Sequence, residues 1–382
     1  EATAMSNGGV QEAGWLSQML GLAPAAKKEK EAKPLSRNVL GKAKYRTSSV
    51  ISIDFLWLVV LAITAESVAN VVVPYAYEGS TFASWLRLIL PSEVDPVLTI
   101  LNLSGAFIDG TVLYLAKWYI QFEDPPLLLV TSGAFCSVYT SLAGIVEHAF
   151  SLSDGTDKVL AVHYVWMMLL LGVGFNLLGR VFVEYSLAPL LRNRDLLDQK
   201  IEGLKTVKLA ETMWDDVVFY ACLSLVAGCA ALCHQGQVGV SPLELFVGSI
   251  WSVLALQFGA WVGGETEYLG IQWGTFKCNA AALMILLASL AAAHLYPHLP
   301  AITVFAKFVG TFLGALSAFN GTSNDTAELL RRGKLFAASG NFTVNLIAML
   351  LCLAALFGVK NAFPRLPEAP TPWAGYYLDF EF

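Results

Sequence analysis

Charged side chains are scarce in this chain: Asp, Glu, Lys and Arg together make up 14% of its 382 residues. Hydrophobic residues make up 56%, and the mean hydropathy is +0.58. A soluble domain carries more charge on its surface, so this balance excludes the ordinary water-soluble class and predicts an all-α polytopic membrane protein. The expected environment is the lipid bilayer. The net charge of −6 indicates no partner by itself, because the charges are segregated by loop.

The chain also lacks the patterns on which enzyme and metal chemistry usually depend. It contains no glycine-rich nucleotide loop, no H-E-x-x-H and no recognisable nucleophile–base pattern. Its six cysteines lie in apolar segments without metal-ligand spacing, which is typical of reduced, packed thiols. We therefore expect no enzyme activity, no catalytic residue, no organic cofactor and no nucleic-acid partner.

Apolar segments recur along the chain, each close to the ~20 residues that a helix needs to cross a bilayer. We predict nine spans, at 50–74, 96–118, 126–149, 159–183, 216–233, 242–263, 273–293, 301–322 and 335–359. Lys and Arg gather before the first span and in the loops that follow the fourth and the eighth. The positive-inside rule then places the N-terminus on the cytoplasmic, stromal or matrix side of a plasma or organellar membrane. The chain begins at Glu1, which fits either a removed organellar presequence or an incomplete sequence.

The same four-helix layout occurs twice. One Asn stands early in the second helix of each unit, Asn102 or Asn279, and a small, hydroxyl-rich stretch interrupts the third helix. One extra helix between the units makes the second unit enter the membrane from the opposite side, which predicts an inverted repeat. The predicted divisions are a basic hydrophilic tail at 1–49, a first unit at 50–187, a linker with a crossing helix at 188–240, a second unit at 241–360 and an aromatic tail at 361–382.

The stretch 309–330 begins as a membrane helix and then becomes polar, with Ser317, Asn320, Thr322 and Asp325 close together. Polar groups at membrane depth must find partners inside the protein or line a cavity. The interruption therefore indicates an ion or substrate path, with close packing of small residues as the alternative explanation. In the first span, Glu66 and Asn70 lie one turn apart and fit either a proton relay or interhelical hydrogen bonds.

These features resemble the fluoride channels (Fluc, also called CrcB), in the tandem-fused form of the eukaryotic fluoride exporters (FEX). Residues 273–279, WGTFKCN, are similar to the opening of the family's second helix. Residues 312–322, FLGALSAFNGT, are similar to the break in its third helix, and residues 135–142, FCSVYTSL, take that place in the first half. The resemblance covers about 50–360 and implies two inverted Fluc-like four-helix units joined by a single linker helix.

The resemblance also implies a path for fluoride. An anion stripped of water needs donors in exchange, and the amide N–H groups of a buried Asn can supply them. The expected pore-lining residues are the polar and aromatic side chains at the two breaks and at the two Asn positions: Asn279, Phe319, Asn320, Thr322, Ser317, Asn102, Thr140 and Ser141. The family implies a structural sodium ion near Ser317 and the backbone of Tyr139.

Two functions stay open at the level of sequence. Of the family's two-Phe box, the second half keeps only Phe319, and Thr322 takes the place of the other Phe. In the first half, Leu142 and Ile145 take both places. The family's arginine at the end of each unit's first helix has no counterpart. The first hypothesis is passive fluoride export through the second-half path. The alternative is a non-conducting structural subunit of a thylakoid or mitochondrial inner-membrane energy-transducing complex, which the two tails would contact.

Overall fold

The computed structural model describes residues 53–78, 90–91, 93–119, 131–155, 158–187, 207–235, 240–263, 267–268, 271–295, 309–317 and 319–362. The predicted tails, 1–49 and the part of 361–382 beyond residue 362, lie outside the described residues, and so does the proposed contact of these tails with other subunits.

The described chain is almost entirely helical, as the composition predicts. The first half contains α3 (Ile53–Ser67), the π-helical turn η1 (Val68–Val72), α4 (Val73–Glu78), α6 (Pro96–Tyr119), η2 (Thr131–Cys136), α8 (Ser137–Tyr139), α9 (Leu142–Gly155), α10 (Lys158–Phe182) and η3 (Val183–Leu187). The second half contains α12 (Val207–His234), α13 (Pro242–Gly263), α14 (Trp273–Leu295), α16 (Phe319–Arg331) and α17 (Leu335–Ala362), and residues 309–316 are also helical. The antiparallel two-residue strands β1 (Glu267–Tyr268) and β2 (Ile271–Gln272) precede α14.

Among the residues that the structure describes, five helices are long and apolar enough to cross a membrane: Pro96–Leu115, Lys158–Ser186, Pro242–Gly263, Trp273–Leu295 and Leu335–Ala362. Two shorter apolar helices, Leu56–Val72 and Val218–His234, accompany them. Helices suit these segments because a helix satisfies its own backbone groups where lipid offers no hydrogen bonds. The predicted all-α class is confirmed, and the long apolar helices are consistent with an integral membrane protein; the nine spans and the inverted repeat stay predictions.

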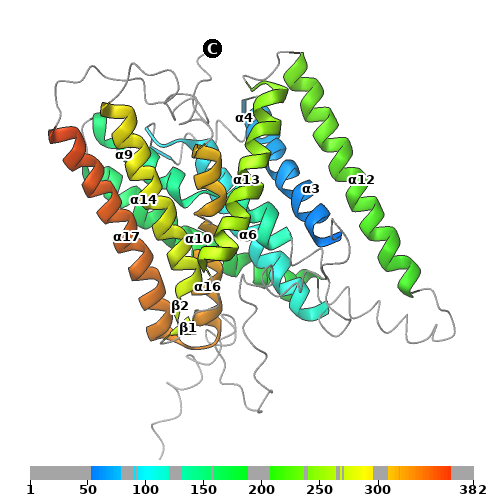
Figure 1. The fold of residues 1–382 in the computed structure, drawn as a ribbon. Coiled ribbons are helices and arrows are strands. Elements are labelled where there is room, and N and C mark those ends of the chain that lie inside the picture. The colour runs from blue at the N-terminus through cyan, green and yellow to red at the C-terminus, as the bar shows by residue number, and fades with distance from the viewer. Residues whose placement is uncertain are drawn as a thin grey trace, which may run out of the picture.

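The helices form a bundle with α12 at one edge and α17 at the other (Figure 1). α12 packs on α3 and α13, whereas α17 packs on α14, α16 and α9. One large apolar core joins both halves, and it includes fully buried side chains such as Leu142, Leu286, Leu313 and Leu353. Large apolar side chains also cover outer faces of α10, α13 and α17, for example Leu170, Leu254 and Leu351, as expected for surfaces in contact with lipid.

Among the described elements, α6 and α10 form the most extensive contact, and glycine allows their backbones to approach closely. A Cβ on Gly110 would lie 2.1 Å from the backbone oxygen of Asn176, and a Cβ on Gly179 would lie 2.2 Å from that of Phe107. Small residues that let backbones meet are the usual means of helix association in membranes, because lipid tails weaken the hydrophobic drive. This contact holds the polar face of α10 beside α6.

Two helices are broken in the middle of the bundle. The first is interrupted between α8 and α9, where Thr140 is extended (φ −115°, ψ 149°). The second ends at a turn at residue 317, and α16 starts at Phe319. Both breaks fall at the hydroxyl- and Asn-rich stretches in which the sequence predicts interruptions.

Candidate functional site

The two helix breaks lie against each other and exchange hydrogen bonds. The N–H of Leu142 donates to the backbone oxygen of Ser317 (3.3 Å), and the N–H of Ala143 donates to Ser317 Oγ (3.0 Å). In return, the N–H of Asn320 donates to Thr140 Oγ1 (3.3 Å). The first N–H groups of a helix have no partner within it, so each break provides acceptors for the helix start of the other. We call residues 140–143 and 317–320 the crossing.

The first-half candidates serve mainly as caps at this crossing. Ser141 Oγ accepts from the N–H of Gly144 (2.8 Å), and Asn102 Oδ1 accepts from the N–H of Ser141 (2.8 Å). The amide nitrogen of Asn102 donates to the backbone oxygen of Leu98 (3.0 Å). Hydroxyl and amide oxygens at a helix start are the usual N-caps. Asn102 and Ser141 thus stabilise the broken helix, and the one hydrogen bond that the Asn102 amide nitrogen forms among the described residues goes to its own helix.

The first-half positions of the Phe box are part of the apolar core. Leu142 and Ile145 are completely buried and belong to the large core that joins the two halves. Phe319 is also completely buried, and it lies against α10. A Cβ on Gly172 would lie 2.2 Å from Cζ of Phe319 and 2.7 Å from Oγ of Ser323. The single retained Phe therefore packs its ring edge on a glycine.

The second-half candidates belong to a column of buried polar side chains between α14, α16 and α17. Its members are Asn279, Thr322, Thr326, Asn341 and Asn345, and each is at most 3% exposed. Asn279 Nδ2 donates to Thr322 Oγ1 (2.7 Å) and to Asn345 Oδ1 (2.8 Å). Asn341 Nδ2 donates to Thr326 Oγ1 (2.9 Å). We call these five residues the polar column.

The direction of these bonds fixes the amide orientations. Thr326 gives its only hydroxyl proton to the backbone oxygen of Thr322, so its oxygen must accept from Asn341. Asn345 donates to the backbone oxygen of Asn341, which turns its Oδ1 toward Asn279. Two buried amide oxygens, Asn279 Oδ1 and Asn341 Oδ1, are left without a partner among the described residues. The column thus offers open acceptors, which a water molecule can satisfy.

Asp325 lies on the same helix as Thr322 but joins a different partner. Its Oδ2 accepts from Thr275 Oγ1 (2.6 Å), which ties α16 to α14 near the start of the latter. Of the acidic residues that the described chain contains, none forms a group of three or more with other His, Cys, Asp or Glu side chains that could hold a metal ion. The expected sodium site near Ser317 and Tyr139 stays a prediction. The Ser317 backbone oxygen could still take part in it, because only one of its two lone pairs is used by the bond from Leu142.

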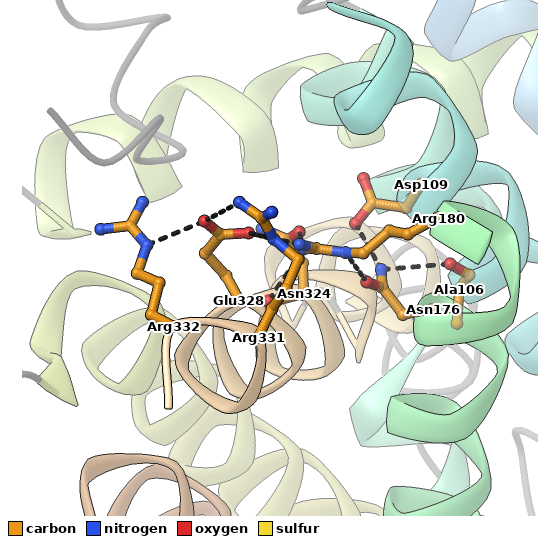
Figure 2. Close-up of polar contacts among 8 residues, drawn as sticks. All are labelled: Ala106, Asp109, Asn176, Arg180, Asn324, Glu328, Arg331 and Arg332. Atoms are coloured by element: carbon orange, nitrogen blue, oxygen red, sulfur yellow. Dashed lines mark hydrogen bonds and ion pairs between the residues drawn. The ribbon is translucent and has the colours of Figure 1, made fainter. Parts of the chain in front are cut away.

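A second polar group, centred on Arg180 of α10, was not predicted from the sequence (Figure 2). Arg180 is almost fully buried, and its Nε donates to Asn176 Oδ1 (3.0 Å). Its Nη2 donates to Asn324 Oδ1 (2.6 Å), and its Nη1 forms an ion pair with Glu328. A cation at this depth is costly unless it is paired and hydrogen-bonded, and here every nitrogen of the guanidinium has a partner.

Glu328 is the acceptor for three arginines. Besides Arg180, it accepts from Arg331 (3.3 Å) and Arg332 (2.8 Å) on its own helix. Burial alone would raise the pKa of Glu328, but the charges of Arg180 and Arg331 outweigh this and hold it well below its usual range. The carboxylate of Glu328 is therefore ionised throughout the physiological range, and it is the ion-pair partner that the three arginines share.

Hydrogen bonds connect the arginine cluster to the crossing. Asn176 Nδ2 donates to Asp109 Oδ2 (3.3 Å), and Ser132 Oγ donates to the other oxygen of Asp109. The backbone oxygen of Ser132 accepts from Asn320 Nδ2 (3.3 Å). A polar route of side chains thus runs from the centre of the bundle to the charged end at Arg331 and Arg332. The spacing of Asn176 and Arg180, one turn apart in an apolar helix, is the sequence signal for it.

The structure brings most of the predicted residues together in two places. Ser317, Asn320, Thr140 and Ser141 meet at the crossing, with Asn102 as a cap. Asn279 and Thr322 meet in the polar column, and Phe319 lies against α10. Comparison with protein-family models, curated proteins and solved structures finds no match to this chain. The chemistry of these two places therefore carries the functional argument.

Proposed function

We propose that this protein is a passive fluoride channel of the fused FEX type, in which nine spans form two inverted four-helix units joined by α12. The observation that carries the proposal is the crossing of two broken helices beside the fully buried polar column. In a helix bundle with a purely structural role, we would expect apolar side chains at these five buried positions, because each buried polar side chain costs free energy. The N-terminus would face the cytoplasmic, stromal or matrix side.

The proposed path follows the polar column, with Asn279 as its central donor. The two N–H groups of Asn279 now point at neutral acceptors, Thr322 and Asn345, at hydrogen-bond distance. An anion that replaced these acceptors would form charge-assisted bonds, which are about twice as strong as neutral ones. The hydroxyl of Ser323 is also buried without a partner among the described residues, but it lies against Gly172 of α10 and is not part of the polar column.

The arginine cluster supports an anion as the transported species. Arg180, Arg331 and Arg332 gather around Glu328, with Glu184 near Arg331, and Lys334 follows on the exposed loop. A positively charged mouth attracts anions and raises their local concentration. The effect depends on ionic strength, because exposed charges are screened beyond about 8 Å at physiological salt.

The test is fluoride efflux from liposomes that contain the purified protein, measured with a fluoride electrode. Asn279→Ala should reduce the flux by about 5- to 150-fold, because the loss of a buried donor to an anion costs roughly 1–3 kcal/mol. The control is Asn361→Ala, which removes an exposed amide at the end of α17. Wild-type flux no greater than that of empty liposomes would refute the proposal.

A second candidate function is a non-conducting structural subunit of an organellar energy-transducing complex. Two observations favour it. The predicted pore residues of the first half act as helix caps or belong to the apolar core. In the polar column, the unpartnered atoms of Asn279 and Asn341 are amide oxygens, which are acceptors and repel an anion. Purification from the native membrane in a mild detergent separates the two proposals. A particle near the chain's own 41.3 kDa plus detergent excludes the subunit proposal, while stoichiometric co-migration with other chains supports it.

A further inference from the structure

A pocket next to the crossing contains two acidic side chains, Glu66 and Glu147. It is lined by residues of α3, η1, α8, α9, α14 and the helix at 309–316, and its polar residues are Glu66, Asn70, Ser141, Glu147 and Thr311. No Lys, Arg or His is among its lining residues. Two acidic side chains thus share a pocket in the apolar bundle without an opposing positive side chain in its wall.

Glu66 is already positioned by hydrogen bonds. One carboxylate oxygen accepts from Ser252 Oγ of α13, and the other accepts from Asn70 Nδ2 (2.8 Å). The interhelical bond that the sequence suggested is therefore present. Each oxygen retains a free lone pair, because a carboxylate can accept about four bonds. Glu147 receives no hydrogen bond from any residue that the structure describes.

Thr311 supplies an independent sign of a ligand. Its side chain lines the pocket and is 8% exposed, and its Oγ1 is buried without a hydrogen-bond partner among the described residues. Thr311 Oγ1 and Glu66 Oε2 both lie within 4 Å of the position that a Cβ on Gly248 would take. A buried hydroxyl without a partner costs free energy, so an unpartnered hydroxyl in the wall of a pocket with two acidic side chains indicates a missing partner.

The chemistry of the wall selects a small hard cation. Carboxylate, hydroxyl and amide oxygens are the ligands of such ions, and soft sulfur and imidazole ligands are absent from the pocket wall. A buried carboxyl group must be paired, coordinate a metal or keep its proton. The donors to Glu66 are neutral and leave its charge in place. One monovalent ion therefore balances the pair when one of the two carboxyl groups keeps its proton, whereas a divalent ion would need both ionised.

We propose that this pocket binds one sodium ion, with oxygens of Glu66, Glu147 and Thr311 as its ligands. This site is distinct from the sodium position that the family resemblance implies at the backbone of the crossing. It does not depend on fluoride conduction, because the pocket involves no residue of the polar column. A bound ion would join α3, α9 and the helix at 309–316, which come from both halves of the chain.

The test is the thermal unfolding temperature of the intact detergent-solubilised protein during titration with Na⁺, at constant ionic strength kept with N-methyl-D-glucamine. Wild-type protein should gain about 5 °C at saturating Na⁺, because a ligand that binds only the folded state stabilises it. Glu147→Gln and Thr311→Val should lose most of this gain. Glu93→Gln, which removes an exposed carboxylate, should keep it.

Binding of ²²Na⁺ to the same preparations gives the second readout. The wild-type protein should bind one ion per chain, and Glu147→Gln should bind none. Glu147 and Thr311 are separate probes, so the test remains decisive if one variant fails to fold. A wild-type protein without a Na⁺ response would overturn the proposal. A full response in both variants would place the ion elsewhere, for example at the crossing, and would overturn it too. Stabilisation by Ca²⁺ but not by Na⁺ would overturn the choice of a monovalent ion.

Discussion

Replacement of Glu328 by Gln should destabilise the protein mainly through Arg180. The variant keeps the size of the side chain but removes the charge opposite an arginine whose side chain is 6% exposed. Loss of one partner from a buried ion pair costs about 3–5 kcal/mol. Glu328 itself is 22% exposed, and Arg180 keeps its bonds to Asn176 and Asn324. We therefore expect a loss of about 2–3 kcal/mol at pH 7.

The loss should depend on pH in a defined direction. The folded-state pKa of Glu328 lies below its ordinary value of 4.5, so the ionised carboxylate stabilises the fold above pH 4.5. This stabilisation declines as the pH falls below that value, because protons then compete with the arginines. Wild type and Glu328→Gln should therefore differ most near neutral pH and should converge in acid.

The assay is reversible unfolding in mixed micelles of mild and denaturing detergent, at pH 7 and at pH 4. A cycle with Arg180→Met isolates the pair. Arg180→Met alone should cost less than Glu328→Gln, since Glu328 retains Arg331 and Arg332. Glu93→Gln is the control for loss of an exposed carboxylate. A Glu328→Gln effect below about 0.5 kcal/mol, or one that is equal at both pH values, would refute the reasoning.

Three further substitutions test the packing and the hydrogen bonds. Gly110→Ala should lower the free energy of unfolding by about 3 kcal/mol, because the new Cβ would lie 2.1 Å from a backbone oxygen of α10. Gly174→Ala on α10 is the control, since its Cβ meets open space and should leave stability unchanged. Thermal unfolding of the two variants measures the difference. Ser317→Ala should cost about 1–2 kcal/mol and speed amide hydrogen exchange at the start of α9, and unchanged exchange would contradict the crossing. Thr326→Val leaves an amide of the polar column without its acceptor and should cost about 1–3 kcal/mol in the unfolding assay, while the exposed Thr343→Val should have no effect.

Much of the helical framework could be predicted from hydropathy and from the residues that interrupt the apolar runs. Apolar runs near bilayer length predict helices because lipid forces backbone groups to pair locally. The breaks at Thr140 and Ser317 were predictable because Gly, Ser, Thr and Asn interrupt those runs. The pairing of Asn279 with Thr322 also follows from the expectation that both line one path.

The arginine cluster could not be predicted in the same way. Arg180 and Glu328 lie 148 positions apart, and nothing local to either residue identifies the other. The resemblance to the fluoride channels predicts an arginine at the end of each unit's first helix, where this sequence has none, but it gives no sign that Arg180 of α10 enters the bundle. The role of Asn102 as a cap likewise depends on a contact across the fold, with Ser141. Such pairings are set by helix packing, for which one sequence holds no direct signal.

The crossing constrains the order in which the protein can be completed. The bonds between the breaks join residues that lie 174 or more positions apart, so the start of α9 has no acceptor from Ser317 until the second half has been synthesised. Until then the N–H groups at the start of α9 lack these acceptors, and contacts of such long range make folding slow. Neither half should be stable when expressed alone, whereas halves made as two chains should rescue each other. For the same reason, a substitution in one break should be tolerated only if the other break can accommodate it.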